Sequence, residues 1–406
     1  LCRASGFMRT DPRVTLRLID ALGNDLCREE RQLEVETAET NVAVSLETFA
    51  EGASGLVGET RWRPELPGPG FYYVEAAMQD ESTLTYQRRL SLALIDTQDV
   101  APHSEFGWTL PNRGDALPPV LLGQLIRQVG IGRVKYPLWF GDERTEQEVE
   151  RVVGFVERLS TAGIELIGLL DKPPQALRSK YAGVEWRGAA AVFAPDPKVW
   201  YPFLEPVMTR LATRVRWWQL GNDLDTSFVT SVDPAAKLKE VKAELDRIGQ
   251  DVNVGIAWPW LHELPPTGKQ PPPWRFLAFS AEPVLTAEEL ATYLDASKGV
   301  SASRWVVLEP LSITDYSADV RATDLVFRMM AAKMHGADAI FCPDPFNDER
   351  GLMNRDGTPG ELLMPWRVAS LALGGANHLG SIDLPNGSPN QVFGKGQEAV
   401  MIVWAW

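Results

Sequence analysis

The central part of the chain alternates between two hydrophobic patterns. From about residue 104 to residue 378, short apolar runs typical of buried strands are followed by segments with apolar residues at helical spacing. The expected strands are SEFGWTL, IGRVKYPLWF, IELIGLLD, RWWQLGND, VNVGIAWPW, WRFLAFS, RWVVLEPL and DAIFCPDPF. A helical segment follows each of them except the fifth, where the prolines of residues 262–273, HELPPTGKQPPP, forbid a helix.

Eight strand–helix units are the number that closes a (β/α)8 TIM barrel of roughly 250 residues. The main alternative is an open doubly wound sheet, which usually carries a glycine-rich phosphate turn after its first strand. No such turn follows SEFGWTL, so the pattern favours the barrel.

Both flanks of this region have the period-two alternation of β-strands. Residues 1–100 contain VTLRLID, LEVET, VAVSLETFA, FYYVEAAMQ and LTYQRRLSLALID, separated by turn clusters such as LGND and PELPGPG. Short strands at this spacing predict a β-sandwich, with the aromatic residues after Gly70 in its core. Residues 379–406 again resemble strands, which either complete the sandwich or begin a further domain. We therefore expect three parts, with the barrel in residues 101–378.

Charge and composition narrow the possible partners. The formal net charge of −14 and the pI near 4.9 disfavour binding to nucleic acid or to an anionic membrane surface. No apolar run is long enough to cross a bilayer, so we expect no membrane insertion.

The chain begins at Leu1 without a visible signal peptide, which is compatible with removal of one or with a truncated chain. We expect an extracellular or periplasmic protein, in which Cys2 and Cys27 either pair or remain free thiols.

Candidate chemistry lies at the ends of the expected strands. In a barrel of this type, the active site is formed at the C-terminal ends of the strands. The residues there are Trp108, Trp139, Asp171, Asn222, Asp223, Trp258, Trp260, Glu309 and Asp344. Two carboxylates on opposing strands suit glycoside hydrolysis, and indole rings offer flat apolar surfaces to sugars. Nothing in this set calls for a nicotinamide, a phosphate or a metal ion, so we expect no cofactor.

An Asn-acid pair at the end of the fourth strand and a Glu at the end of the seventh resemble the signature of clan A glycoside hydrolases. The layout is similar to the β-xylosidase and α-L-iduronidase branch, in which flanking β-strands form an accessory sandwich. The resemblance covers roughly residues 104–378, by strand order more than by local identity. It implies that Asn222 would hold the sugar 2-hydroxyl, that Asp223 would replace the acid/base and that Glu309 would be the nucleophile. The implied activity is hydrolysis, with retention, of O-glycosidic bonds in a polysaccharide or oligosaccharide.

The fourth-strand motif departs from the family at one position. Asp223 stands where the family has Glu, so its carboxyl group would lie about 1.5 Å further back, a displacement that can cost about two orders of magnitude in rate. Either the backbone moves inward, or Asp225 serves as the acid, or the catalytic pair is degenerate. A degenerate pair would make the barrel a weak or inactive module that binds glycans or serves as a structural part of a cell-surface protein.

Several of these residues also have simple structural explanations. Asn222 and Asp223 both favour helix caps and Asx turns. Asp171 and Asp344 are each followed by proline within two residues, which predicts turns. We interpret the tryptophans inside the strands, Trp217, Trp218 and Trp305, as core or helix-facing residues.

Overall fold

A computed structural model describes residues 1–7, 11–36, 56–80, 83–96, 104–111, 117–139, 146–180, 188–265, 271–385 and 389–403. The chain divides into two compact units. The first comprises residues 1–97 together with 358–364, and the second comprises residues 98–357 and 365–406.

The first unit is the predicted β-sandwich. One antiparallel sheet has the order β3-β2-β6-β7, with β2 at Arg13–Asp20, β3 at Asp25–Gln32, β6 at Gly70–Asp80 and β7 at Thr83–Leu94. The other has the order β1-β5-β4, with β1 at Cys2–Phe7, β4 at Glu34–Glu36 and β5 at Leu56–Thr60. Side chains of both sheets share a core that includes Val14, Leu16, Met78, Ala4 and Val35.

Three sequence expectations concern this unit. Of the aromatic residues after Gly70, Phe71 and Tyr72 are buried in the core as predicted. Cys2 and Cys27 are free thiols in the structure, which is one of the two alternatives that the sequence allowed. The expected strand VAVSLETFA, residues 42–50, lies outside the described residues.

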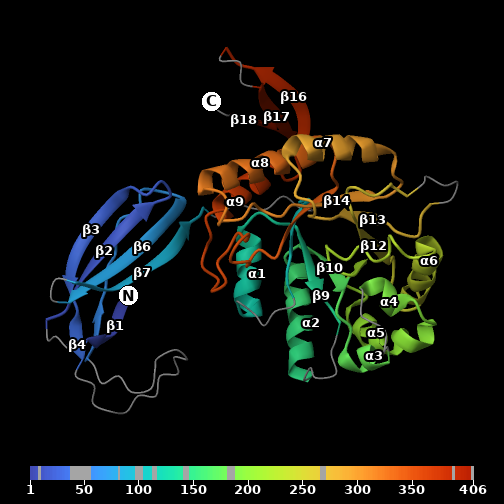
Figure 1. Cartoon of the computed structure of the whole chain (residues 1–406), viewed down its shortest axis with the longest axis horizontal. Helices are drawn as coiled ribbons and strands as arrows, with labels where there is room; N and C mark the ends of the chain where they lie inside the picture. The colour runs from blue at the N-terminus through green and yellow to red at the C-terminus, as the bar shows by residue number, and fades with distance from the viewer. Residues whose placement is uncertain are drawn as a thin grey trace. The chain divides into compact units, whose positions relative to one another are not determined.

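The second unit contains the predicted closed barrel, whose eight parallel strands run in the order β8 to β15 around the ring (Figure 1). Their bounds are β8 Phe106–Thr109, β9 Arg133–Pro137, β10 Glu165–Leu170, β11 Trp217–Leu220, β12 Asn253–Trp258, β13 Phe276–Phe279, β14 Ser303–Val307 and β15 Ala339–Pro343. The principal helices are α1 Pro119–Gln128, α2 Glu146–Thr161, α5 Pro197–Leu211, α6 Pro234–Leu245, α7 Ala287–Ala296, α8 Ala318–Met334 and α9 Leu363–Leu373. Two short helices that we did not expect, α3 Gln175–Ser179 and α4 Ala189–Phe193, precede α5.

Helix starts follow local capping chemistry. Thr286 and Glu289 form a capping box at α7, in which each side chain accepts a hydrogen bond from the other residue's backbone amide. Asp196 and Asp233 cap α5 and α6, and each helix has proline as its first residue.

The barrel interior is filled by alternate residues of the strands. Ile167, Phe276, Trp305 and Phe341 form one buried cluster there together with Ala278 and Ala339, and Trp217 packs against it. The rings of Phe276 and Trp305 stack with centroids 3.6 Å apart. Since successive side chains on a strand point to opposite faces, this cluster fixes which residues face the axis and which face the helices. Trp217 and Trp305 are therefore core residues, as the sequence predicted.

The connection from β12 to β13 is irregular wherever it is described, as its prolines predict. Trp260, just after β12, makes two aromatic contacts on this side of the barrel. Its ring stacks on Phe279 of β13 with centroids 4.4 Å apart, and it also contacts Tyr293 of α7 at 6.0 Å. An aromatic stack thus covers this side of the barrel.

Three C-terminal strands, β16 Asn377–Asp383, β17 Pro389–Lys395 and β18 Glu398–Ile402, form an antiparallel sheet of their own. They group with the barrel unit, and Lys395 Nζ donates to the backbone oxygen of Leu371 in α9 at 3.2 Å. Among the described strands they pair only with one another.

Gly107 of β8 tests how tightly the interior is packed. A Cβ atom at this position would lie 2.5 Å from the Phe341 ring and 2.7 Å from the Arg133 backbone oxygen. We expect Gly107→Ala to lower the free energy of unfolding by about 1–3 kcal/mol through overpacking, as measured by chemical denaturation. Gly123 of α1 is the matched control, because a Cβ there would meet nothing within 4 Å. Gly123→Ala should leave stability unchanged or raise it, and equal losses in both variants would contradict the explanation.

Candidate functional site

Asp223 lies inside the mouth of the barrel, where donors from three strands converge on its carboxylate. Lys135 Nζ of β9 donates to Oδ1 at 2.5 Å, and Gln219 Nε2 of β11 donates to the same oxygen at 3.0 Å. Thr109 Oγ1 of β8 donates to Oδ2 at 2.6 Å. Only 4% of Asp223 is exposed, so its oxygens are enclosed by these donors.

Lys135 is fully buried and faces the barrel axis, with its ammonium 4.2 Å from the centre of the Phe341 ring. Burial lowers the pKa of Lys135, because the charged form loses its hydration, and the nearby Asp223 carboxylate opposes that shift. The two charges balance each other in a part of the protein where either alone would be very unfavourable. The pair therefore works as a neutral structural unit.

Glu309 differs from Asp223 in its access to solvent. It follows β14 by two residues, on the strand face that carries Trp305 and Val307, and its side chain is 27% exposed. Arg350 Nη1 donates to Glu309 Oε2 at 2.7 Å, and this contact raises the pKa of Arg350. The Glu309 backbone is also held, because Arg328 Nη1 of α8 donates to its carbonyl oxygen at 2.9 Å. Glu309 is thus a fixed and accessible carboxylate.

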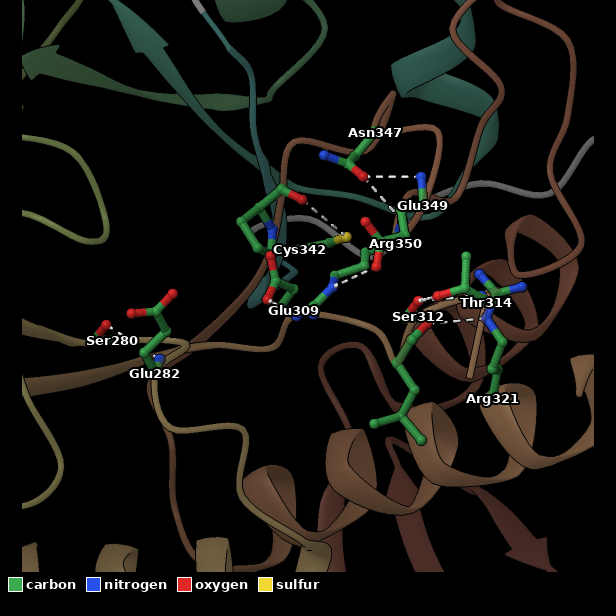
Figure 2. Close-up of polar contacts among 12 residues, drawn as sticks. Ser280, Glu282, Glu309, Ser312, Thr314, Arg321, Cys342, Asn347, Glu349 and Arg350 are labelled. Atoms are coloured by element: carbon green, nitrogen blue, oxygen red, sulfur yellow. Dashed lines mark hydrogen bonds and ion pairs between the residues drawn. The ribbon is translucent and has the colours of Figure 1, made fainter. Parts of the chain in front are cut away.

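The loop after β15 delivers Arg350 to Glu309 (Figure 2). Asn347 Oδ1 accepts hydrogen bonds from the backbone amides of Glu349 and Arg350, each at 3.0 Å, and these bonds shape the turn. In Figure 2 the guanidinium of Arg350 points from this turn toward Glu309, while Glu282 stands apart beyond the end of β13. The loop therefore positions the cation of Arg350 beside Glu309.

Asn222 and Asp225 take local structural contacts. Asn222 Oδ1 accepts from the amide of Leu224 at 2.9 Å, which is the Asx turn that the sequence offered as an alternative. Asp225 Oδ2 accepts from the amide of Ala189 at the start of α4 at 2.6 Å, and its Oδ1 accepts from the amide of Ser227. Both side chains thus organise the chain that leaves β11.

Trp108 and Trp139 are buried rather than spread over an open surface. Gly107 faces the interior ring of Phe341, so alternation places Trp108 on the helix-facing side of β8, where its edge meets Phe346. Trp139 stacks on Phe193 of α4 with centroids 6.3 Å apart. Neither indole N–H has a hydrogen-bond partner among the described residues.

Trp258 and Trp260 also lie on the outer side of their strand. Gly255 of β12 faces the interior ring of Phe276, so Trp258, three residues later, faces outward. Trp258 lines a cavity of about 800 Å³ together with His262, Trp274, residues of α6 and the prolines that precede β13. Neither Asp223 nor Glu309 lines this cavity. The irregular connection therefore borders a hollow on the outside of the barrel, separate from the two carboxylates.

The sequence interpretation did not include Thr109, Lys135, Gln219 or Arg350. Lys135 carried a usable signal, since it is a charged residue inside an otherwise apolar strand, at a position whose alternation points inward. Arg350 carried none, because its role depends on the fold of a loop. Among the described residues, no group of three or more His, Cys, Asp or Glu side chains could hold a metal ion. None of the described helices is both long and apolar enough to span a membrane.

Comparisons with known proteins support the fold. No family model matches the sequence, and no curated protein matches it significantly. A family 39 glycoside hydrolase from the gut symbiont Bacteroides cellulosilyticus WH2 has a similar structure, with a TM-score of 0.62 and 15% identity over 98% of this chain and 85% of that one. At this identity the likeness concerns the fold, and the expected resemblance to clan A glycoside hydrolases is confirmed at that level.

Weaker similarities involve longer proteins. A β-galactosidase from the psychrophilic Marinomonas ef1 gives a TM-score of 0.49 at 12% identity, over 66% of this chain and 59% of that one. A Bacteroides uniformis β-glucuronidase gives 0.46 at 11% identity, over 91% of this chain and 47% of that one. This chain thus spans about half the length of that β-glucuronidase.

The buried pair can be tested by removing one charge and then both. Asp223→Leu leaves the Lys135 ammonium buried without a counter-charge, so we expect it to lower the free energy of unfolding by about 3–5 kcal/mol. The double variant Lys135→Met/Asp223→Leu removes both charges and should recover most of that loss. Chemical denaturation of the three proteins measures both effects. A single variant as stable as the parent would show that the pair is not a structural unit.

Proposed function

We propose that the barrel hydrolyses O-glycosidic bonds of a polysaccharide or oligosaccharide at its C-terminal mouth, with Glu309 as the nucleophile and with retention of configuration. The observation that supports this most directly is the state of Glu309. It is a partly exposed carboxylate at the end of the seventh strand, held by Arg350 at 2.7 Å in a barrel of the glycoside hydrolase type. Attack on an anomeric carbon needs an accessible carboxylate, and the hydrogen bond from Arg350 holds the Glu309 carboxylate in place.

In this proposal Asp223 has a structural role and is not the proton donor. A general acid must carry a proton and must reach the departing oxygen. Asp223 is enclosed by Thr109, Lys135 and Gln219, whose donors occupy both of its oxygens. The missing methylene relative to the family's Glu is consistent with this position, because the shorter side chain remains within the mouth.

A second candidate function is glycan binding without hydrolysis. It is favoured by the same Asp223 contacts, because a barrel that has lost its acid could still recognise a sugar. The two candidates differ in one observable. A barrel with a working nucleophile cleaves glycosides whose leaving group needs no proton, whereas a pure binding module cleaves none.

Substitution of Glu309 tests the proposed nucleophile. We expect the unmodified protein to release 2,4-dinitrophenol from at least one member of a panel of dinitrophenyl glycosides, and Glu309→Gln to abolish that release. The first-formed sugar should retain the anomeric configuration of the substrate, as seen by proton NMR. Glu349→Gln is the matched control, because Glu349 lies on the same loop and approaches Arg350 only at 3.7 Å. Binding of oligosaccharides without release of any dinitrophenol would instead support the binding module.

A further inference from the structure

We propose that Asp171, at the end of the third barrel strand, is the proton donor of this site. The inference rests on the proposed glycoside hydrolysis and assigns the proton-donor role that the proposal does not give to Asp223. It reverses the sequence interpretation, in which Asp171 was predicted to form a turn before Pro173 and Pro174.

Strand register places Asp171 beside the family's acid position. The pairing of β10 with β11 ends at Leu170 opposite Leu220, and the amide of Gly221 donates to the Leu170 carbonyl at 3.1 Å. Asp171 is therefore level with Gly221, directly next to the Asn222–Asp223 pair. Alternation from Ile167, which belongs to the interior cluster, puts Asp171 on the face directed toward the barrel axis.

The same register places Asp171 across the mouth from Glu309. β10 and β14 are four positions apart in either direction around the eight-stranded ring, so their ends face each other. Glu309 also lies on the inward face of its strand, two residues beyond Val307. The two residues therefore stand on opposite walls of the mouth, each on the inward face of its strand, and we infer that a glycosidic bond is held between them.

The surroundings of Asp171 suit a group that must hold a proton. Its Oδ1 is buried and accepts no hydrogen bond from any described residue, unlike the oxygens of Asp223. Burial raises the pKa of Asp171, and the negative charge of Asp225 adds to this. The charge of Lys172 and the backbone amides of Asp171 and Lys172 oppose the shift without cancelling it. No side-chain ion pair of Asp171 occurs among the described residues.

The chemistry then follows in two steps. Glu309 attacks the anomeric carbon as the bond to the leaving oxygen breaks, and that oxygen takes the bond's electron pair together with the proton of Asp171. The products are the leaving alcohol, a covalent glycosyl ester on Glu309 and an ionised Asp171. Asp171 next removes a proton from water, whose oxygen attacks the anomeric carbon and releases Glu309.

Glu282 is the principal rival for this role. It follows β13 by three residues and lies apart from Glu309 in Figure 2. Its side chain is exposed, so it lacks the burial that raises the pKa of Asp171. Asp225 is less suitable, because both of its oxygens accept hydrogen bonds from backbone amides at the start of α4 and at Ser227.

The test compares leaving groups across two variants. Asp171→Asn preserves the shape of the side chain but cannot donate a proton. We expect it to lower kcat/KM for an unactivated benzyl glycoside about 100-fold or more, and to lower it far less for the dinitrophenyl glycoside of the same sugar. Glu282→Gln should give the same ratio of the two substrates as the parent. Azide should accelerate turnover of the dinitrophenyl substrate by Asp171→Asn and yield a glycosyl azide, since azide attacks the ester without needing a base.

The outcomes separate the two proposals. If the parent cleaves both substrates and Asp171→Asn changes them equally, or if Glu282→Gln gives the leaving-group dependence instead, then the assignment of Asp171 is wrong and the proposed hydrolysis stands. If the parent cleaves no glycoside, both proposals are wrong.

Folding of the variant is checked by its circular dichroism and by its azide-rescued turnover. A carbon NMR titration gives an independent readout, in which the carboxyl resonance lost in Asp171→Asn should titrate above the ordinary range of aspartate.

Discussion

The buried ion pair between Lys135 and Asp223 is the interaction on which the mouth of the barrel depends. It joins the second strand to the turn after the fourth, and Thr109 extends it to the first. Such a pair is unfavourable to bury and even less favourable to break, because one charge alone would remain in an apolar interior. The geometry that satisfies it therefore restricts how the loop after β11 can be placed. The Asn222 turn and the contacts of Asp225 with α4 follow from that placement.

This constraint also divides the acidic residues of the mouth by their possible roles. One carboxylate is enclosed by three buried donors that occupy both of its oxygens. A second is partly exposed and is held by one arginine, and burial raises the pKa of a third, whose Oδ1 accepts no hydrogen bond from any described residue. Asp223, Glu309 and Asp171 represent these three environments within one ring of strand ends. Neighbouring donors, more than position in the motif, decide which acid can do which chemistry.

The hydrophobic pattern was sufficient to predict the barrel and the sandwich, because strand and helix periods depend on which residues must be buried. It also placed Glu309 and Asp223 at strand ends, since the end of a strand can be recognised from the local sequence.

The pairing of Lys135 with Asp223 could not be predicted in the same way, because the two residues are far apart in sequence and meet only when the barrel closes. Strand β3 was missed because DLCREERQ is too polar to be recognised as a strand, although β2 pairs with it along most of its length. Likewise, Trp258 and Trp260 suggested sugar contacts from their positions alone, and the direction in which β12 turns its side chains was needed to place them outside.

The irregular connection between β12 and β13 has a consequence for how the barrel could be divided. Elsewhere, an α-helix packed on the outside of the sheet connects neighbouring strands, but here the described residues supply the pairing of β12 with β13 and the aromatic stack around Trp260. A cut among the described residues of this connection would break no helix, and it would separate a fragment ending in five consecutive barrel strands from one carrying the remaining three. The two fragments would associate through β-ladders, because the unpaired backbone N–H and C=O groups of their edge strands can form hydrogen bonds without a covalent link. This segment is therefore the natural place to reconstitute the barrel from two separately expressed chains.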